Sequence, residues 1–529
     1  MAFCAPHTPG AGRVVIVGSG IAGLVAAARL AHAGLSVLVI DRHGTPGGKM
    51  RALPSSAGPV DAGPTVLTMR AVFDELFAEL GERLEDHVGL LRQRILARHF
   101  WPDGSQLDLF DTEADSTEAI RALAGKRAAG QFRAFCARAR DLFDGFETPV
   151  MRTPAPSLPA LALHVARNPG LLGRMAPLST LHDLLRRSFD DPRLVQLFGR
   201  YATYVGGAPD RVPALLALIW QAEAAGVWAV EGGLHRLADA IAELARLRGA
   251  EFCYGADAAS IETAGGGVRA VTLADGTRLP AGSVLFNGDP RALATGRLGA
   301  DVAGVAPQTA QAPRSLSAEV WAFAAVPQGP ELAHHNVFFR ADAQPEFDAL
   351  AAGRLDPSPT LYVCAQDRAG TARHRGPERF ETIANAPPLS GDTPRQEVDQ
   401  CRTRTFGTLA RFGLRFGPEP GDQTLTTPEG FDSLFPASGG ALYGQSPHGM
   451  TAALRRPTAR TSVPGLYLAG GGVHPGAGVP MAALSGRHAA AAILSDRIST
   501  SISPETATRG GTSTGSATMA GRPSASSRS

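Results

Sequence analysis

The stretch that decides the fold reads Val14-Val15-Ile16-Val17-Gly18-Ser19-Gly20-Ile21-Ala22-Gly23. Its first four residues are apolar and predict a buried strand that leads into a glycine turn. Gly18 lacks a Cβ atom and permits a tight turn, Gly20 lets the backbone approach a pyrophosphate, and Gly23 allows close packing of helix on strand. This order of strand, turn and helix predicts a dinucleotide-binding unit.

The residues that follow the turn complete this unit. Leu24 to Ala33 is rich in alanine and leucine and is predicted to form a helix whose N-terminal N–H groups face the phosphates. Residues 36–40 predict a second buried strand, which ends at Asp41, 18 residues after Gly23. An acidic residue at this position accepts hydrogen bonds from ribose hydroxyls, so we predict that role for Asp41.

A second glycine turn comes directly after Asp41. It reads Arg42-His43-Gly44-Thr45-Pro46-Gly47-Gly48-Lys49-Met50. In one interpretation this turn also approaches the pyrophosphate, with Lys49 as its counter-charge. The alternative is an ordinary surface loop, and the residues alone leave both open.

A further glycine segment lies near the end of the chain. Leu466-Tyr467-Leu468-Ala469 predicts a strand that leads into residues 470–478, which contain five glycines. A helix is predicted from Val479 to Ile493, with Pro480 in its first turn, and its N-terminus can stabilise negative charge on a reduced flavin ring. Glycine segments at both ends favour a flavin dinucleotide, because a nicotinamide enzyme usually needs only the first. The acidic residue that many flavoproteins carry in this last turn is absent.

Size and composition narrow the possible classes. A chain of 529 residues is too long for one compact core, so two packed domains are expected. A net charge of +2 with only 19% charged residues argues against a nucleic-acid-binding protein. The five cysteines show no CxxC spacing and are predicted to be reduced thiols. No secretory or membrane-spanning segment is predicted, so we expect a soluble or peripheral protein.

The pattern along the chain predicts discontinuous domains. Residues 13–80, 225–295 and 460–497 are predicted to form the cofactor domain, and residues 81–224 and 296–459 a substrate domain. Residues 498–529 are rich in Ser, Thr, Gly and Ala and are predicted to be a disordered tail.

One segment of the predicted substrate domain is unusual in its charge. From Thr148 to His182 there is no acidic residue, while Arg152, Arg167 and Arg174 punctuate an apolar stretch. Such a segment can lie at a membrane surface. The alternative is a buried helical subdomain whose arginines reach solvent.

These motifs resemble those of the amine oxidase and carotenoid desaturase superfamily of flavoproteins. Within it, the chain is similar to desaturases of the bacterial phytoene desaturase type and especially to the 1-hydroxycarotenoid 3,4-desaturases (hydroxyneurosporene desaturases, methoxyneurosporene dehydrogenases). The segments that carry the resemblance are residues 61–81, 443–449 with Arg455-Arg456-Pro457, and 465–488. Phytoene desaturases usually have Thr-His-Pro-Gly-Ala-Gly followed by Ile-Pro-Gly. Here Val473-His474 and Val479-Pro480-Met481-Ala482 differ, which favours the hydroxycarotenoid subgroup.

The resemblance implies a fold, a cofactor and a set of contacts. The fold is α/β, with a Rossmann-type FAD-binding domain and an inserted mixed α+β substrate domain. The implied FAD contacts are Gly18, Ser19, Gly20, Ile21, Ala22, Gly23, Asp41, Arg42, Gly48, Lys49, Gly63, Pro64, Thr65, Gly471, Val479, Pro480 and Met481.

The resemblance also implies an activity. It is FAD-dependent removal of two hydrogens at C-3,4 of an acyclic 1-hydroxycarotenoid, as in spheroidene or spirilloxanthin synthesis, with oxygen or a quinone-linked electron acceptor. Phytoene desaturation, carotenoid isomerisation and a non-catalytic prenyl-lipid escort role are the alternatives. The expected location is cytoplasmic and peripheral to the inner membrane. No metal site and no catalytic acid or base is assigned; Asp61, His448 and His474 are candidates for which a structural role is the alternative.

Overall fold

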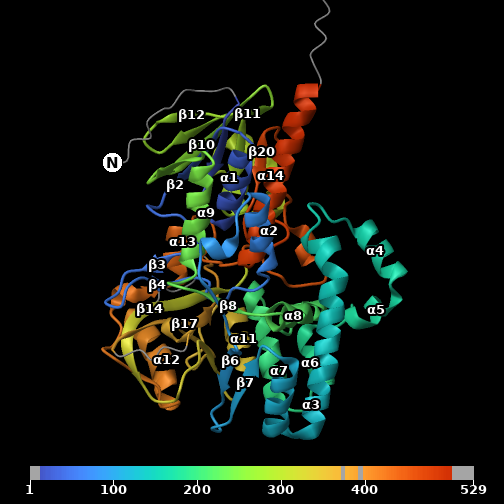
Figure 1. Cartoon of the computed structure of the whole chain (residues 1–529), viewed down its shortest axis with the longest axis vertical. Coiled ribbons are helices and arrows are strands. Elements are labelled where there is room, and N and C mark those ends of the chain that lie inside the picture. Colours follow the sequence, from blue (N-terminus) through green and yellow to red (C-terminus); the bar gives the residue numbers. More distant parts are fainter. Residues whose placement is uncertain (1–11, 371–375, 391–396, 503–529) are drawn as a thin grey trace, which may run out of the picture.

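The computed structural model describes residues 12–370, 376–390 and 397–502. Figure 1 shows two parts along the long axis of the molecule. The upper part holds a parallel sheet, and the lower part holds a large mixed sheet with a layer of helices beside it.

The upper sheet consists of five parallel strands. Their spatial order is β20 (Leu466–Leu468), β13 (Ser283–Phe286), β1 (Val14–Val17), β2 (Val37–Asp41) and β9 (Glu251–Tyr254). The strands β1, β2, β13 and β20 are almost entirely buried, as expected for a parallel sheet covered on both faces. The predicted α/β fold with a Rossmann-type sheet is confirmed.

Alternate residues of the central strands enter two separate cores. Ile16 and Val39 belong to a cluster formed with α1 (Ile21–His32), α9 (His235–Leu247) and α14 (Val479–Ile502). Their neighbours Val15 and Ile40 enter the cluster on the opposite face. That face is covered by the antiparallel strands β10 (Ala258–Ala264), β11 (Gly267–Leu273) and β12 (Arg278–Pro280), and by α10 (Pro290–Ala294).

Helices α1 and α14 come into backbone contact at Gly486. A Cβ atom at this position would collide with the carbonyl oxygen of Ala22. The contact brings the first and last glycine segments of the chain to the same place, and Figure 1 shows α1 and α14 side by side.

The lower sheet is mostly antiparallel. Its order is β18 (Arg415–Gly417), β14 (Ser317–Gln328), β17 (Glu378–Ala386), β16 (Leu361–Ala365), β15 (His335–Phe338), β6 (Ile95–Phe100) and β7 (Gln106–Phe110), and β19 (Leu425–Thr426) also pairs with β14. Only the pair of β15 with β6 is parallel among the described strands of this sheet. Two small ladders join β3 (Ala52–Leu53) to β4 (Val60–Asp61) and β5 (Leu90–Arg92) to β8 (Trp228–Val230).

Helices complete the lower part. They are α3 (Glu113–Phe146), α6 (Leu181–Ser188), α7 (Pro192–Gly199), α8 (Leu218–Ala224), α11 (Gln344–Ala351), α12 (Val398–Arg411) and α13 (Pro428–Leu434). Helix α2 (Ala71–Glu79) instead packs in the upper core with α1, α9 and α14. An aromatic core of Phe132, Phe135, Phe198 and Trp220 joins α3, α7 and α8.

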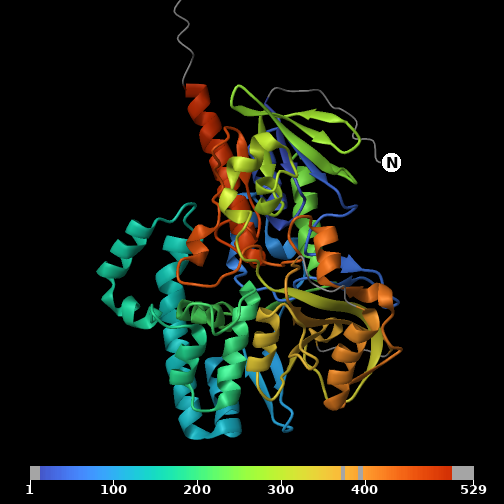
Figure 2. The same ribbon diagram turned by 180° about the vertical axis from the view of Figure 1, so that it is seen from behind.

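Two short helices stand apart from this core. Helices α4 (Leu158–Arg167) and α5 (Pro169–Met175) contain no buried residue. Figures 1 and 2 show them projecting from the end of α3. The alternative of a buried helical subdomain is therefore wrong for α4 and α5.

Helix α1 begins earlier than the sequence predicts. It starts at Ile21 instead of Leu24, because Gly20 is extended (φ −66°, ψ 167°) and serves as its N-cap. Ile21, Ala22 and Gly23 thus form the first turn of the helix that faces the predicted phosphates.

Helix α14 ends later than predicted. It runs to Ile502, so the prediction of a disordered tail is wrong for residues 498–502, where the helix continues beyond the body of the protein. The remainder of the predicted tail, residues 503–529, lies outside the described residues.

The cysteines agree only in part with the prediction of reduced thiols. Cys136, Cys364 and Cys401 form no disulfide bond, whereas Cys253 is disulfide-bonded, which corrects the prediction for that residue. Sequence spacing cannot reveal which distant cysteines a fold brings together. Within the described residues, no helix is both long and apolar enough to cross a membrane.

The packing of α1 on α14 leads to a first prediction. Gly486→Ala is expected to destabilise the protein by about 1–3 kcal/mol, because the new methyl group has no space against Ala22. Gly407→Ala is the matched control: it also lies within a helix, but a Cβ there meets no atom within 4 Å. It should be neutral or stabilising, since alanine has the higher helix propensity. Urea unfolding midpoints of the two variants check this, and equal midpoints would contradict the close packing.

Candidate cofactor and substrate site

A cavity of about 950 Å³ opens between the two parts of the molecule. Its walls include the carboxyl ends of β1, β2 and β13, the N-terminus of α14, and residues of α8, β14 and β16. Clefts at the carboxyl ends of parallel strands are where open α/β sheets bind ligands. The cavity thus joins a nucleotide-type site to a second, largely apolar chamber.

The first glycine turn forms one wall of this cavity. Gly18, Gly20, Ile21 and Ala22 line it, whereas Ser19 is fully buried behind the turn. Gly23 does not line the cavity either. A Cβ atom at Gly23 would collide with the carbonyl oxygen of Gly18, so its role is to keep α1 close to the turn.

Asn287 holds this turn in place. It follows β13, and its Nδ2 donates hydrogen bonds to the carbonyl oxygens of Gly18 (3.0 Å) and Gly20 (3.2 Å). Asn287 is not among the predicted FAD contacts, although residues 284–290 resemble the strand that ends in Asn in this superfamily. Its position at the carboxyl end of a predicted buried strand could have indicated this role, because the carboxyl ends of parallel strands meet at one edge of the sheet.

Asp41 lines the cavity and also braces the turn. Its Oδ2 accepts hydrogen bonds from the backbone N–H (2.6 Å) and the hydroxyl (2.7 Å) of Ser19, and its Oδ1 accepts one from the N–H of His43 (2.8 Å). A carboxylate offers about four acceptor positions, so one remains for a ribose hydroxyl. Asp41 can therefore take the predicted role without giving up its contacts to Ser19.

The second glycine turn packs directly on the first. The N–H of Gly47 donates to the carbonyl oxygen of Ser19 (2.9 Å), and a Cβ atom at Gly48 would lie 3.1 Å from Cα of Gly20. The alternative of an ordinary surface loop is therefore wrong. A third turn, which contains Gly63, lies against the second, since a Cβ at Gly63 would collide with the carbonyl oxygen of Lys49.

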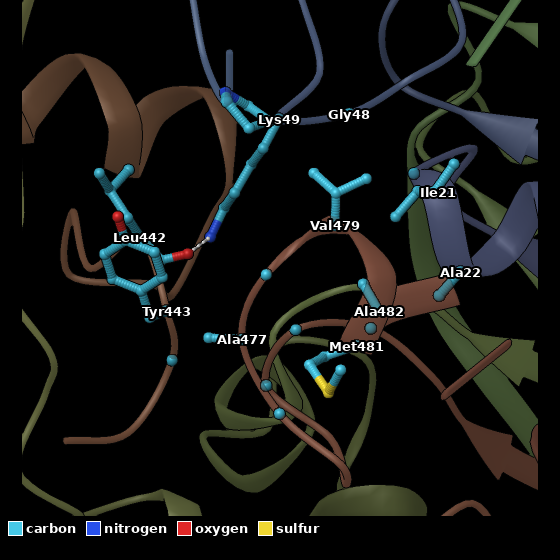
Figure 3. Close-up of a pocket in the computed structure, with 18 of the residues that line it drawn as sticks. Ile21, Ala22, Gly48, Lys49, Leu442, Tyr443, Ala477, Val479, Met481 and Ala482 are labelled. Atoms are coloured by element: carbon cyan, nitrogen blue, oxygen red, sulfur yellow. Dashed lines mark hydrogen bonds between the residues drawn. The ribbon is translucent and has the colours of Figure 1, made fainter. Parts of the chain in front are cut away.

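Lys49 lies inside the cavity and points to the segment before Tyr443. Figure 3 shows its Nζ donating a hydrogen bond of 2.5 Å to the carbonyl oxygen of Leu442. Burial lowers the pKa of Lys49 to about 8; the carboxylate of Asp289 opposes that shift, and the nearby Arg456 adds to it. Protein carboxylates thus balance the positive charge of this ammonium only in part, so Lys49 is suited to bind an anion. Arg42 also lines the cavity, 3.6 Å from the carboxylate of Asp257.

The last glycine segment lies opposite the first. Gly471, Val479, Pro480 and Met481 line the cavity, and Figure 3 shows Val479 near Ile21. Helix α14 begins at Val479, so its free N–H groups and positive dipole end face the cavity.

A carboxylate from elsewhere in the chain lies beside the acid-free last turn. Asp289 follows β13, lines the cavity and pairs with Arg314. Arg456, whose pKa burial lowers to about 10, donates to the carbonyl oxygens of Gly471 (2.7 Å) and Tyr443 (3.0 Å). Asp289 is not among the residues predicted from the sequence, because no motif spacing connects it with residue 471.

Residues 63–65 connect the cofactor side with the lower sheet. Gly63, Pro64 and Thr65 line the cavity, and the hydroxyl of Thr65 shares a hydrogen bond of 2.7 Å with that of Tyr362 on β16. The Tyr362 hydroxyl shares another, of 2.6 Å, with Nδ1 of the buried His335. This chain of hydrogen bonds fixes the Tyr362 ring in the floor of the cavity.

Beyond Thr65 the cavity becomes mostly apolar. Its walls there are Phe143, Phe146, Val150, Met151, Leu215, Leu216, Leu218, Ile219, Val320 and Ile383, with Arg200, Tyr204 and Glu223 among them. A chamber of this composition suits a long apolar molecule with few polar groups.

The three candidates for acid or base do not line the cavity. Asp61 accepts hydrogen bonds from the N–H groups of Leu234 (2.5 Å) and His235 (3.2 Å), which anchors the start of α9. His448 accepts one from the N–H of Ala208 (3.2 Å), and Nε2 of His474 donates to a backbone carbonyl (2.9 Å). These contacts favour the structural alternative for all three residues.

The cavity fits a flavin dinucleotide. Four glycines, Gly18, Gly20, Gly48 and Gly471, expose backbone where a pyrophosphate or ring must come close, and Lys49 supplies positive charge. That each of the predicted residues contacts FAD stays a prediction.

Comparison with known proteins agrees with this geometry. Residues 21–494 match the family described as flavin containing amine oxidoreductase. The chain is 54% identical to the hydroxyneurosporene desaturase of Cereibacter sphaeroides over 489 residues, which cover 92% of this chain and 99% of that protein. It is 52% identical to the protein of the same name from Rhodobacter capsulatus (92% and 98% covered) and 45% identical to that from Rubrivivax gelatinosus (96% and 98% covered).

Solved structures share the fold at low sequence identity. Putrescine oxidase bound to putrescine superposes with a TM-score of 0.58 at 17% identity, over 92% of this chain and 99% of that one. Cyclohexylamine oxidase from Brevibacterium oxydans gives a TM-score of 0.57 at 16% identity, with the same coverage. The predicted superfamily fold is thereby confirmed.

The position of Lys49 predicts a pH dependence of FAD affinity. The pyrophosphate of bound FAD would raise the lowered pKa of Lys49 again. At a pH between the pKa of Lys49 in the free protein and its higher pKa in the complex, the complex holds one proton more than the free protein. Affinity therefore falls as pH rises, by up to about tenfold per pH unit. Titrations that follow flavin fluorescence should show Kd increasing above about pH 8, the pKa of Lys49 in the free protein.

Two variants isolate the contribution of this side chain. Lys49→Met should bind FAD more weakly at neutral pH. Its FAD affinity should not show this dependence on pH, because the methionine side chain at position 49 does not titrate. Lys126→Met is the matched control, since Lys126 is exposed on α3 and outside the cavity, and it should keep the wild-type profile. If Lys49→Met kept that profile, Lys49 would not be the counter-charge.

Proposed function

This chain belongs to the family of flavin-containing amine oxidoreductases and is an FAD-dependent oxidoreductase, and from that premise we propose that it introduces the 3,4 double bond into an acyclic 1-hydroxycarotenoid. The observation that carries the proposal is the continuous cavity, in which glycine turns for a dinucleotide open into an apolar chamber. Relatives named hydroxyneurosporene desaturase, 45% to 54% identical over nearly their whole length, support this substrate class.

The chemistry requires a cofactor and a dry, apolar chamber. When bound, FAD would supply the two-electron acceptor for the oxidation of a C–C single bond to a double bond. The side chains around Phe146, Leu216 and Ile383 would exclude water and hold the polyene. The N-terminus of α14 supplies a positive dipole end, which favours negative charge on a neighbouring ring.

The electron acceptor in this proposal is oxygen or a quinone-linked carrier. The sequence holds one strand followed by GxGxxG, at residues 14–23, and no second unit of that kind for a nicotinamide cofactor.

We further propose that the protein binds a membrane surface through α4 and α5, on the cytoplasmic side of the inner membrane. Leu158, Leu163, Leu172 and Leu178 are 58%, 51%, 53% and 100% exposed, and the segment contains no acidic residue. Apolar side chains among arginines are suited to the headgroup region of an anionic bilayer.

These helices also adjoin the apolar chamber. His164 of α4 donates a hydrogen bond of 2.9 Å to the carbonyl oxygen of Gly145, between the cavity residues Phe143 and Phe146. The proposed membrane-binding helices thus lie next to a wall of the apolar chamber.

The first test of the proposed function is substrate selection. Purified, FAD-loaded protein is expected to convert 1-hydroxyneurosporene in liposomes to the 3,4-desaturated product, detected as a bathochromic shift and by mass spectrometry as the loss of two hydrogens. Phytoene should remain unconverted. Conversion of phytoene but not of the hydroxylated compound would overturn the proposed substrate, and isomerisation without loss of hydrogen would overturn the proposed reaction.

The second test concerns the membrane surface. Wild-type protein is expected to float with liposomes that contain anionic lipid, and the double variant Leu163→Asp with Leu172→Asp to lose at least about tenfold in partitioning. Leu247→Asp is the matched control: Leu247 is 68% exposed on α9, away from α4 and α5, and its replacement should leave flotation intact. Equal flotation of all three proteins would assign membrane binding to another surface.

A further inference from the structure

The apolar chamber contains a basic side chain, Arg200. It lies on the 3₁₀ helix η3 (Arg200–Val205), directly after α7. Its guanidinium donates a hydrogen bond of 3.2 Å to the hydroxyl of Tyr204 and lies over the rings of Tyr204 and Tyr362, 5.2 Å and 5.4 Å from their centroids. Within the described part of the chain, no carboxylate lies at ion-pair distance from Arg200, although Glu223 lies near enough to interact with its charge.

This guanidinium keeps unused hydrogen-bond donors. It has five N–H groups, and the bond to Tyr204 uses one of them. None of its nitrogens is enclosed without a partner, so the remaining donors are open to the cavity. A cation in an apolar chamber is costly unless a polar group meets it, so these donors indicate a polar atom on the ligand.

Other polar side chains hold Arg200 in place. Glu223 is 3% exposed and accepts a hydrogen bond of 2.7 Å from the hydroxyl of Tyr201. The carboxyl of Glu223 also interacts with the hydroxyl of Tyr204, the partner of Arg200. This group of side chains has a defined geometry before any ligand binds.

Arg200 is linked through Tyr362 and Tyr443 to the part of the cavity that holds the predicted FAD contacts. It stacks on Tyr362, whose hydroxyl is bonded to Thr65, a predicted FAD contact. It also acts on Tyr443: burial raises the pKa of Tyr443 to about 12, and the charge of Arg200 opposes that rise. Tyr443 in turn follows Leu442, the partner of Lys49. Arg200 is therefore at the reacting end of the chamber and not at a remote end.

The proposed substrate needs a polar contact at this place. Its hydroxyl is on C-1, and the bond that is oxidised begins at C-3, with a single carbon between them. When C-3 and C-4 are at the flavin, the hydroxyl must be beside the flavin too. The donors of Arg200 beside Tyr362, whose hydroxyl is bonded to Thr65, are suited to form a subsite for that hydroxyl.

We propose that Arg200, held by Tyr204 and Glu223, forms the subsite that binds the C-1 oxygen of the carotenoid and thereby determines which bond reaches the flavin. The oxygen would accept hydrogen bonds from the free N–H groups of the guanidinium. The proposal rests on the proposed function, and it assigns Arg200 to specificity and not to the chemical step.

The test compares two substrates that differ only in the hydroxyl. FAD-loaded wild type, Arg200→Met and Tyr204→Phe are each assayed with 1-hydroxyneurosporene and with 1,2-dihydroneurosporene, and the ratio of the two kcat/KM values is measured. We expect Arg200→Met to lower this ratio at least about a hundredfold, because a buried site built for a hydroxyl discriminates strongly through its donors. Tyr204→Phe, which loosens Arg200, should lower it about tenfold. Arg186→Met, an exposed arginine of α6 outside the cavity, should keep the wild-type ratio.

The flavin spectrum separates folding from recognition. Each variant should retain FAD and its absorption bands. If Arg200→Met loses FAD, Arg200→Lys is measured instead. The ammonium of the introduced lysine lies further from the C-1 oxygen than the guanidinium does, so this variant should lower the ratio at least about tenfold. An unchanged ratio in the FAD-loaded Arg200 variant overturns the inference while leaving the proposed function intact. Equal use of both compounds by wild type also overturns the inference. Failure of wild type to desaturate the hydroxylated carotenoid overturns the proposed function itself.

Discussion

The structure depends on backbone segments that approach one another where a side chain would leave no room. A Cβ atom at Gly23, Gly63 or Gly486 would collide with a carbonyl oxygen of another segment, and one at Gly48 would lie 3.1 Å from Gly20. These contacts bring together two glycine turns, the turn that carries Thr65, and both terminal helices of the cofactor part. Because backbone packs on backbone there, the exposed N–H groups form a cradle suited to a pyrophosphate.

The cavity divides its chemistry between two halves. The cofactor half concentrates charge: Lys49 and Arg456 have pKa values lowered by burial, and Asp289 compensates them only in part. Burying these cations costs free energy when no anion is bound, and a bound anion offsets that cost. This matches the binding of a dinucleotide, which carries a pyrophosphate. The substrate half is apolar, so positioning of a polyene there relies on shape. Arg200 is the exception in that half, and its place beside Tyr362 gives the apolar chamber a fixed reference point near the predicted ring.

Much of the cofactor part follows from local patterns in the sequence. The strands at residues 14–17 and 37–41 and the helix that begins at Val479 agree with prediction to within a residue or two at those boundaries. The helix after the first turn began three residues early, since Gly20 caps it in an extended conformation. The site was less predictable: Asn287, Asp289 and Arg200 belong to no motif spacing. The end of α14 and the disulfide bond of Cys253 were predicted wrongly. Residue composition says little about where a helix ends, and the spacing of cysteines says little about which of them come together in the fold.

The sequence by itself determined the strand, turn and helix of residues 14–23, the acid at residue 41 and the family, because these depend on side-chain periodicity and on backbone conformations only glycine adopts easily. Only the tertiary structure decided what surrounds them. It places Asn287 on a turn 269 residues earlier in the chain, packs the turn at Gly48 on Gly20, exposes the leucines of α4 and α5, and sets Arg200 against Tyr362. Such pairings join residues far apart in sequence, and their geometry follows from the packing of whole sheets and helices, which no local pattern records.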